Sequence, residues 1–128
     1  MQAALIGDDD VLLDMLQAAL QHAGYTVVVI HDVEGAAARL RAIKLDALLL
    51  NVGMYPRESG WHLFAELAAD PTLSTLPLIV YTIDHQDLET HAAVLQQQGC
   101  QVLLAPFTLA GLYEALKRAG RDEREATA

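Results

Sequence analysis

The chain has 128 residues, of which 53% are hydrophobic and 20% are charged, and this size suits one ordinary domain. So much apolar surface excludes intrinsic disorder, because its burial can offset the entropy lost on ordering. The formal net charge of −9 repels nucleic acid, the single cysteine excludes an internal disulfide framework, and no apolar run reaches the roughly 18 residues of a membrane span.

Short apolar runs alternate with segments of helical periodicity along the chain. Each aliphatic run predicts a strand, and each periodic segment predicts a helix. The predicted strands cover residues 3–7, 25–30, 47–50, 78–82 and 102–104. The predicted helices cover residues 11–23, 33–44, 60–69, 87–98 and 109–119, and we expect residues 120–128 to form a frayed, charged tail.

Five strand–helix units predict a parallel sheet with helices on both faces, and right-handed crossovers make it a doubly wound α/β domain. In such sheets, ligands bind beyond the carboxyl ends of the strands. The candidates for chemistry are therefore the residues after the five strands: Asp8, Asp9 and Asp10; His31 and Asp32; Asn51 and its loop; Thr82; and Ala105.

The three consecutive aspartates allow two interpretations. They can flank the following helix, whose positive N-terminal end favours carboxylates. They can also form a carboxylate pocket for a hard cation such as Mg²⁺. Their position at the carboxyl end of a strand favours a pocket, active or vestigial.

Five segments of the chain form one pattern: ALIGDDD before a helix, LDALLLN, the loop with Met54 and Pro56 ahead of Gly60, LPLIVYT, and LLAPF before a helix. Together they resemble the receiver domain of bacterial two-component response regulators. The resemblance covers roughly residues 3–119. It implies a three-layer αβα, flavodoxin-like (CheY-like) fold with strand order 2-1-3-4-5, a receiver-like domain over residues 1–119 and a tail over 120–128.

The resemblance also assigns roles to residues of the pocket. Two acids that help to hold Mg²⁺ match Asp8 and Asp9, and Asp10 matches a third acid often found there. A Ser or Thr that contacts the phosphoryl group matches Thr82. The aspartate that accepts the phosphoryl group is replaced by Asn51, whose amide cannot act as a carboxylate nucleophile.

Three further positions depart from the family pattern. Ala105 stands where a lysine pairs with the phosphoryl charge, ahead of the expected Pro106-Phe107. Val102 stands where an aromatic residue of the fifth strand changes rotamer on activation. The resemblance places a metal-ligating backbone carbonyl at Gly53, but the loop is one residue longer than usual, which argues against that ligand.

These departures predict an atypical receiver, or pseudo-receiver: a phosphorylation-independent protein-interaction module in bacterial two-component or phosphorelay signalling, and not an enzyme. We expect no required cofactor and at most weak Mg²⁺ binding at Asp8 and Asp9. Expected partners are a sensor kinase, an output protein, or a second copy bound through the fourth helix, fifth strand and fifth helix, without direct nucleic-acid or membrane contact. The N-terminal residues lack the basic start of a signal peptide, so we expect a cytoplasmic location.

Two other functions stay open. A receiver can be switched by unconventional phosphorylation of an acid such as Asp8, Asp9 or Asp10, or by Mg²⁺ binding. A small Mg²⁺-dependent phosphatase-like hydrolase would use Asp8 and Asp10, which have the required spacing. The chain has no room for a cap domain, however, and no suitable lysine follows the fourth strand.

Other residues that carry potential chemistry have simpler interpretations. The five histidines show no metal-ligand motif, and we expect them to be solvated on helices or loops. Trp61 is expected to be a partly buried packing residue near the pocket edge. Val11 and Met15 share one side of the first helix and predict a small apolar patch for a partner.

Overall fold

The computed structural model describes the backbone of residues 1–56, 58–105 and 107–127, and the side chains of these residues as far as residue 119. The strands are β1 (Gln2–Ile6), β2 (Thr26–Ile30), β3 (Ala47–Asn51), β4 (Leu78–Thr82) and β5 (Gln101–Leu104). The helices are α1 (Asp10–His22), α2 (Ala36–Arg41), α3 (Ser59–Ala69), the 3₁₀ helix η1 (Leu73–Thr75), α4 (His85–Thr90), α5 (Ala92–Gln98) and α6 (Leu109–Thr127).

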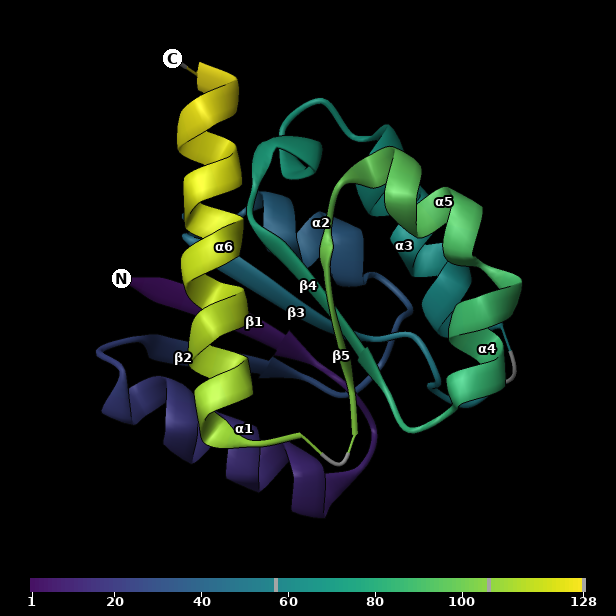
Figure 1. Ribbon diagram of the computed structural model, residues 1–128, viewed down its shortest axis with the longest axis horizontal. Coiled ribbons are helices and arrows are strands. Elements are labelled where there is room, and N and C mark those ends of the chain that lie inside the picture. Colours follow the sequence, from purple (N-terminus) through teal and green to yellow (C-terminus); the bar gives the residue numbers. More distant parts are fainter. Residues whose placement is uncertain (57, 106, 128) are drawn as a thin grey trace.

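The five strands form one parallel sheet in the order β2-β1-β3-β4-β5. In Figure 1, α6 lies in front of this sheet and α2 lies behind it. This arrangement confirms the predicted doubly wound αβα fold. The strand order reverses between β1 and β3, so the residues that follow these two strands meet at a topological switch point.

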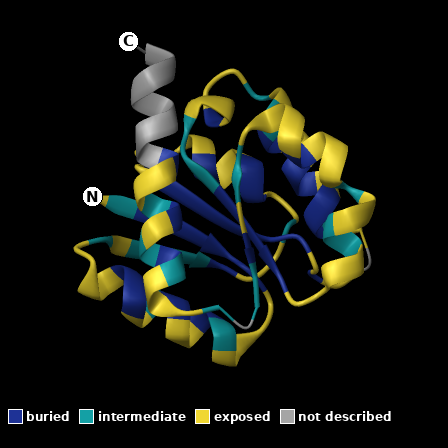
Figure 2. Ribbon diagram, viewed as in Figure 1, coloured by how far each residue is buried: buried dark blue, intermediate teal, exposed yellow. Residues whose placement is uncertain are grey.

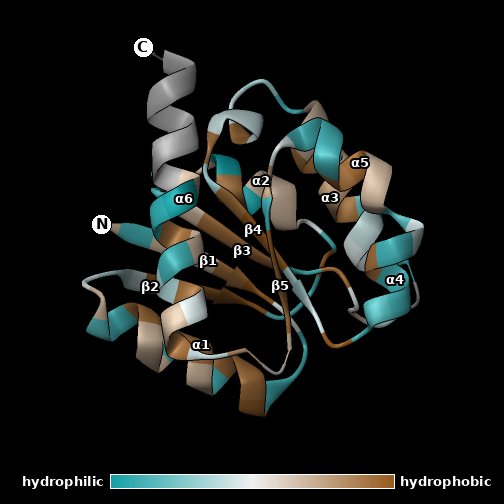
Figure 3. Ribbon diagram, viewed as in Figure 1, coloured by the Kyte–Doolittle hydropathy of each residue, from teal (hydrophilic) through white to brown (hydrophobic). Residues whose placement is uncertain are grey.

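The sheet separates two apolar clusters because neighbouring residues of a strand point to opposite faces. In β3, Leu48 and Leu50 join the cluster covered by α2, α3 and α5, whereas Ala47 and Leu49 join the cluster covered by α1 and α6. All of β3 is buried, and this explains its continuous apolar run. Figures 2 and 3 show the buried, hydrophobic strands between helices whose outer faces are exposed and more polar.

The prediction of a single helix over residues 87–98 is wrong, because two helices, α4 and α5, occupy this region. Helix α4 begins at His85, before the predicted start at residue 87. Asp84 caps this end, because its side chain accepts a hydrogen bond from the Asp87 backbone N–H at 3.1 Å. The chain leaves the helical conformation at His91, where φ is −106° and ψ is 15°. The His91 ring contacts other residues at this joint, and a periodicity pattern cannot detect such contacts.

Two other boundaries also differ from the prediction. The last helix was expected to end at residue 119, but α6 continues to Thr127. Arg, Glu and Ala in this segment are good helix formers, and a single interior glycine costs only about 1 kcal/mol. The second helix is shorter than predicted, because Gly35 adopts a left-handed conformation with φ of 72°.

No helix among the described residues is both long enough and apolar enough to cross a bilayer.

Candidate functional site

The carboxyl ends of β1, β3 and β4 enclose a pocket of about 680 Å³. The fold brings five of the predicted site residues together in its lining: Asp8, Asp9, Asn51, Gly53 and Thr82. They come from three segments that lie about 30 to 40 positions apart along the chain, and the parallel sheet makes them neighbours.

The acids of the β1–α1 turn divide between the two interpretations offered by the sequence. Asp9 is the N-cap of α1, where its Oδ1 accepts a hydrogen bond from the Leu12 N–H at 3.1 Å. Asp10 is the first residue of α1 and is absent from the described pocket lining. Asp8 reaches across the pocket, and its Oδ2 accepts a hydrogen bond from the Tyr55 N–H at 2.8 Å. One acid therefore bridges the loops and one caps the helix.

Asn51 ends β3 with a side chain that is only 8% exposed. Its Oδ1 accepts a hydrogen bond from the Gly53 backbone N–H at 2.9 Å, so the amide oxygen stabilises the loop that follows. Gly53 lies so close to Thr82 that a Cβ on the glycine would be 2.9 Å from Oγ1. The side chain of Thr82 is buried, and its Oγ1 accepts a hydrogen bond from the Asp84 N–H at 3.1 Å.

The backbone of Ala105 lies beside Thr82, because its N–H donates to the Thr82 carbonyl at 2.8 Å, but Ala105 is absent from the described lining of the pocket. Its methyl group brings no charge, and the described lining of the pocket contains no lysine or arginine. Val102 is 40% exposed on the edge strand β5 and is not aromatic. The expected Pro106 lies outside the described residues.

Tyr81, which the sequence did not point to, lies next to the pocket on β4 and contacts the end of β1. It is buried, and its hydroxyl donates to the Ile6 carbonyl at 3.1 Å. Burial raises the pKa of this hydroxyl far above its ordinary value, and the Asp8 and Asp9 carboxylates raise it further. Gly7 is required here, because a Cβ at that position would be 2.5 Å from the Tyr81 hydroxyl.

Apolar side chains are exposed around the pocket. Val11 in the first turn of α1 is 82% exposed, Tyr55 in the β3–α3 loop is 83% exposed, and Ile83 after β4 is 75% exposed. Ile83 also lines the pocket itself. The sequence had pointed to Val11 with Met15, but Tyr55 and Ile83 belong to loops without a periodic pattern.

A second polar cluster lies between α3 and the α4–α5 joint and consists of Glu58, Trp61, Asp87 and His91. The expectation that all histidines are solvated is wrong for His91, whose ring is half-buried and stacks on Trp61 with centroids 3.7 Å apart. Trp61 is more buried than expected, at 6% exposed, and its indole N–H donates to Asp87.

Comparison with known proteins identifies the architecture and the family. A family model for the response regulator receiver domain matches residues 3–117. A sensor protein from Polaromonas sp. JS666 has a TM-score of 0.83 and 18% identity, with 95% of this chain and 97% of that chain covered. No curated protein matches the chain at a significant level.

Two further solved structures share the fold. The receiver domain of a sensor histidine kinase from Pseudomonas aeruginosa PAO1, with a magnesium ion coordinated in its active-site cleft, has a TM-score of 0.78 and 24% identity over 94% of this chain and 97% of that chain. The signal receiver domain of an HD domain-containing protein from Pseudomonas fluorescens Pf-5 has a TM-score of 0.81 and 21% identity over 98% and 90%.

Proposed function

Because this chain belongs to the response-regulator receiver family of two-component signalling, we propose that it is a pseudo-receiver, which works through protein contacts without being phosphorylated. The observation that carries this proposal is Asn51 at the end of β3. A receiver forms an acyl phosphate on a carboxylate at this position. An amide oxygen is a poor nucleophile, and here it already accepts a hydrogen bond from Gly53.

The rest of the pocket supports the same proposal. A transferred phosphoryl group carries several negative oxygens that need cationic partners. At the lysine position Ala105 offers a methyl group, and Asp8 and Asp9 add negative charge instead. The incoming phosphoryl group would therefore meet repulsion without a nucleophile. This argues equally against an enzyme that hydrolyses phosphate esters here.

Residues for a Mg²⁺ ion are present in part. Asp8 and Asp9 each bond one backbone N–H through one oxygen, which leaves the second oxygen of each carboxylate for a hard cation and its waters. The Asn51 oxygen accepts the Gly53 N–H with one lone pair, and as a neutral ligand it would add no negative charge to hold the cation. When bound, Mg²⁺ would neutralise the two acids. We propose that it binds weakly and is not required.

If the pocket is not phosphorylated, the protein must act through the surface around the pocket. We propose that the exposed side chains of Val11, Tyr55 and Ile83, which all lie near the strand ends, together form an apolar rim, because exposed apolar patches mark protein-binding sites. We propose that a sensor kinase or an output protein docks there. Val94 and Val102, which are 43% and 40% exposed, support a second surface for a copy of the same chain.

Intact-mass spectrometry tests the proposal. The protein is incubated with acetyl phosphate and Mg²⁺, alongside the single variant Asn51→Asp and the double variant Asn51→Asp, Ala105→Lys. The wild type should keep its mass. The double variant should gain one phosphoryl group, because it regains both the nucleophile and the cation.

The single variant separates the two losses. If the single variant is labelled as fully as the double variant, Asn51 alone accounts for the absence of phosphorylation in the wild type. A stoichiometric phosphoryl adduct on the wild type would overturn the proposal, and fragment mapping would then show which acid had accepted it.

A further inference from the structure

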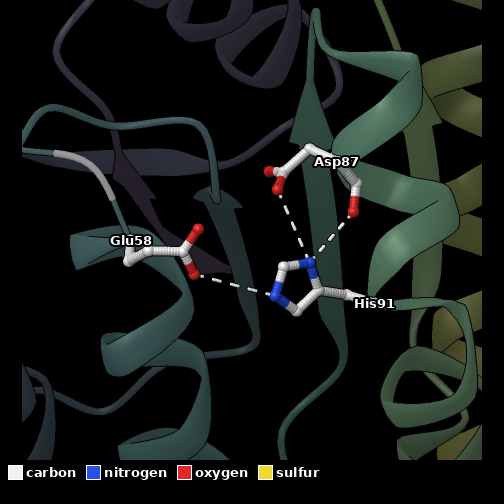
Figure 4. A group of neighbouring side chains, drawn as sticks. All are labelled: Glu58, Asp87 and His91. Carbon is white, nitrogen blue, oxygen red and sulfur yellow. Dashed lines mark hydrogen bonds and ion pairs between the residues drawn. The ribbon is translucent and has the colours of Figure 1, made fainter.

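The second polar cluster has the chemistry of a transition-metal site, separate from the pocket at the strand ends. Glu58 is the N-cap residue of α3, Asp87 lies in α4, and His91 forms the joint between α4 and α5. The ligand atoms of these three residues all lie within 4.8 Å of one another. Figure 4 shows the imidazole of His91 between the two carboxylates. None of the three lines the pocket that holds Asp8 and Asp9.

The imidazole of His91 is held in one orientation. Its Nδ1 lies 3.0 Å from the Asp87 carbonyl oxygen and 3.5 Å from Asp87 Oδ1, so the ring proton belongs on Nδ1. One face of the ring stacks on Trp61 at an interplanar angle of 12°. Asp87 is itself fixed, because its Oδ2 accepts the Trp61 indole N–H at 2.7 Å. A carboxylate that orients a histidine in this way is the usual outer partner of a metal ligand.

The remaining ring nitrogen faces a second carboxylate. His91 Nε2 lies 3.7 Å from Glu58 Oε2. With the proton on Nδ1, a neutral imidazole presents a lone pair to a negative oxygen, and two acceptors in this arrangement need a cation between them. Among the described residues, neither Glu58 nor Asp87 pairs with a lysine or arginine. Within the described part of the chain, a metal ion or a proton on Nε2 would have to supply that positive charge.

The backbone at Glu58 supports a role for its side chain. Glu58 is the one residue other than glycine with positive φ in the described chain, at 71°. This conformation is unfavourable for a side chain and recurs where function requires it. Here it places the Glu58 carboxylate opposite His91 Nε2, 33 positions away along the chain.

We propose that a divalent transition-metal cation of the Zn²⁺ class binds between His91 Nε2 and the Glu58 carboxylate, with Asp87 orienting the ring and water completing the shell. Two metal–ligand bonds of about 2.0–2.1 Å at a tetrahedral angle span about 3.4 Å, so the 3.7 Å gap needs only a small adjustment of Glu58. An imidazole ligand favours Zn²⁺ or Ni²⁺ over Mg²⁺ or Ca²⁺. The ion would tie the start of α3 to the α4–α5 joint.

Trp61 is the only tryptophan of the chain and stacks on the proposed ligand, so its fluorescence reports on this site. Protein freed of metal with a chelator is titrated with Ni²⁺ at pH 7.5 in excess Mg²⁺, which competes for the carboxylates of the pocket. We expect saturable quenching of Trp61 by Ni²⁺, and recovery when Zn²⁺ displaces it.

Three variants locate the site. His91→Gln and Glu58→Gln should each weaken the Ni²⁺ affinity at least tenfold. His85→Gln is the matched control, because His85 and Glu89 form an exposed pair 3.2 Å apart on α4 and have no stacking contact with Trp61. It should leave the quenching unchanged. Because Glu58 is about half-exposed, its variant tests the site even if His91→Gln fails to fold.

The metal proposal is overturned if Ni²⁺ leaves Trp61 fluorescence unchanged, or if quenching persists in both His91→Gln and Glu58→Gln. It is also overturned if acidification alone changes the fluorescence, in a His91-dependent way, while Ni²⁺ and Zn²⁺ have no effect. The cation would then be a proton on Nε2. None of these outcomes depends on phosphorylation, so the pseudo-receiver proposal is judged separately.

Discussion

At the scale of single residues, the amide side chain of Asn51 limits the negative charge of the pocket. A carboxylate at position 51 would add a third negative charge beside Asp8 and Asp9, in a lining whose described residues include no lysine or arginine. Negative charges that share one pocket repel and so destabilise each other. Asn51 avoids that repulsion and bonds its own loop at Gly53. Under the pseudo-receiver proposal, the acid missing at position 51 and the lysine missing at position 105 offset each other in charge.

Part of the site could be predicted from the sequence and part could not. Asp8, Asn51 and Thr82 follow directly after apolar runs, so the topology of a parallel sheet places them together. The stacking of Trp61 on His91 joins residues 30 positions apart, one from α3 and one from the α4–α5 joint. Their meeting depends on where α4 ends, and no local pattern encodes that position.

Tyr81 provides a test at this scale. Tyr81→Phe removes the hydroxyl that donates to the buried Ile6 carbonyl, and we expect it to lower the free energy of unfolding by about 1–2 kcal/mol in chemical denaturation. Tyr113→Phe is the control, because its hydroxyl makes a longer bond of 3.3 Å to Ala19 in a half-buried position, and the loss should be smaller. Equal stability of wild type and Tyr81→Phe would contradict the role given to this hydroxyl.

At the scale of elements, the strands were easier to predict than the helix ends. Every β-strand lies within a residue or two of its predicted range, because buried parallel strands need continuous aliphatic runs. The short helix η1 was not predicted. Its start depends on Asp70, whose Oδ1 accepts from the Thr72 and Leu73 N–H groups. The break at His91 likewise depends on side-chain contacts that the apolar pattern does not contain.

The packing of α3 on β3 gives a prediction for Gly60. A Cβ at this position would be 2.5 Å from the Val52 carbonyl oxygen, which is backbone and cannot rotate away. Gly60→Ala should therefore destabilise the fold by about 2–3 kcal/mol.

Gly111→Ala is the matched helical control for Gly60→Ala. Its Cβ would meet only the Thr108 hydroxyl at 3.3 Å, on an exposed residue, so stability should change by less than about 1 kcal/mol. Thermal unfolding followed by circular dichroism compares the two variants. Similar melting temperatures for both would contradict the close approach of α3 to Val52.

At the scale of the whole molecule, a switch must carry a change in the pocket to a distant surface. Under the pseudo-receiver proposal this chain lacks both the phosphoryl acceptor and the residue that reports the change, because Asn51 is an amide and Val102 of β5 is not aromatic. Two well-packed apolar clusters hold the sheet from both faces. We therefore expect one conformation, with or without a phosphoryl donor.

The most direct measurement is a pair of ¹H–¹⁵N correlation spectra of the labelled protein, recorded before and after addition of Mg²⁺ and acetyl phosphate. The pseudo-receiver account predicts small shifts confined to amides near Asp8 and Asp9, from weak Mg²⁺ binding, and unchanged signals from β5 and α6. A new set of signals that extends from β4 into β5 would contradict it, because the pocket would then still drive a change of conformation.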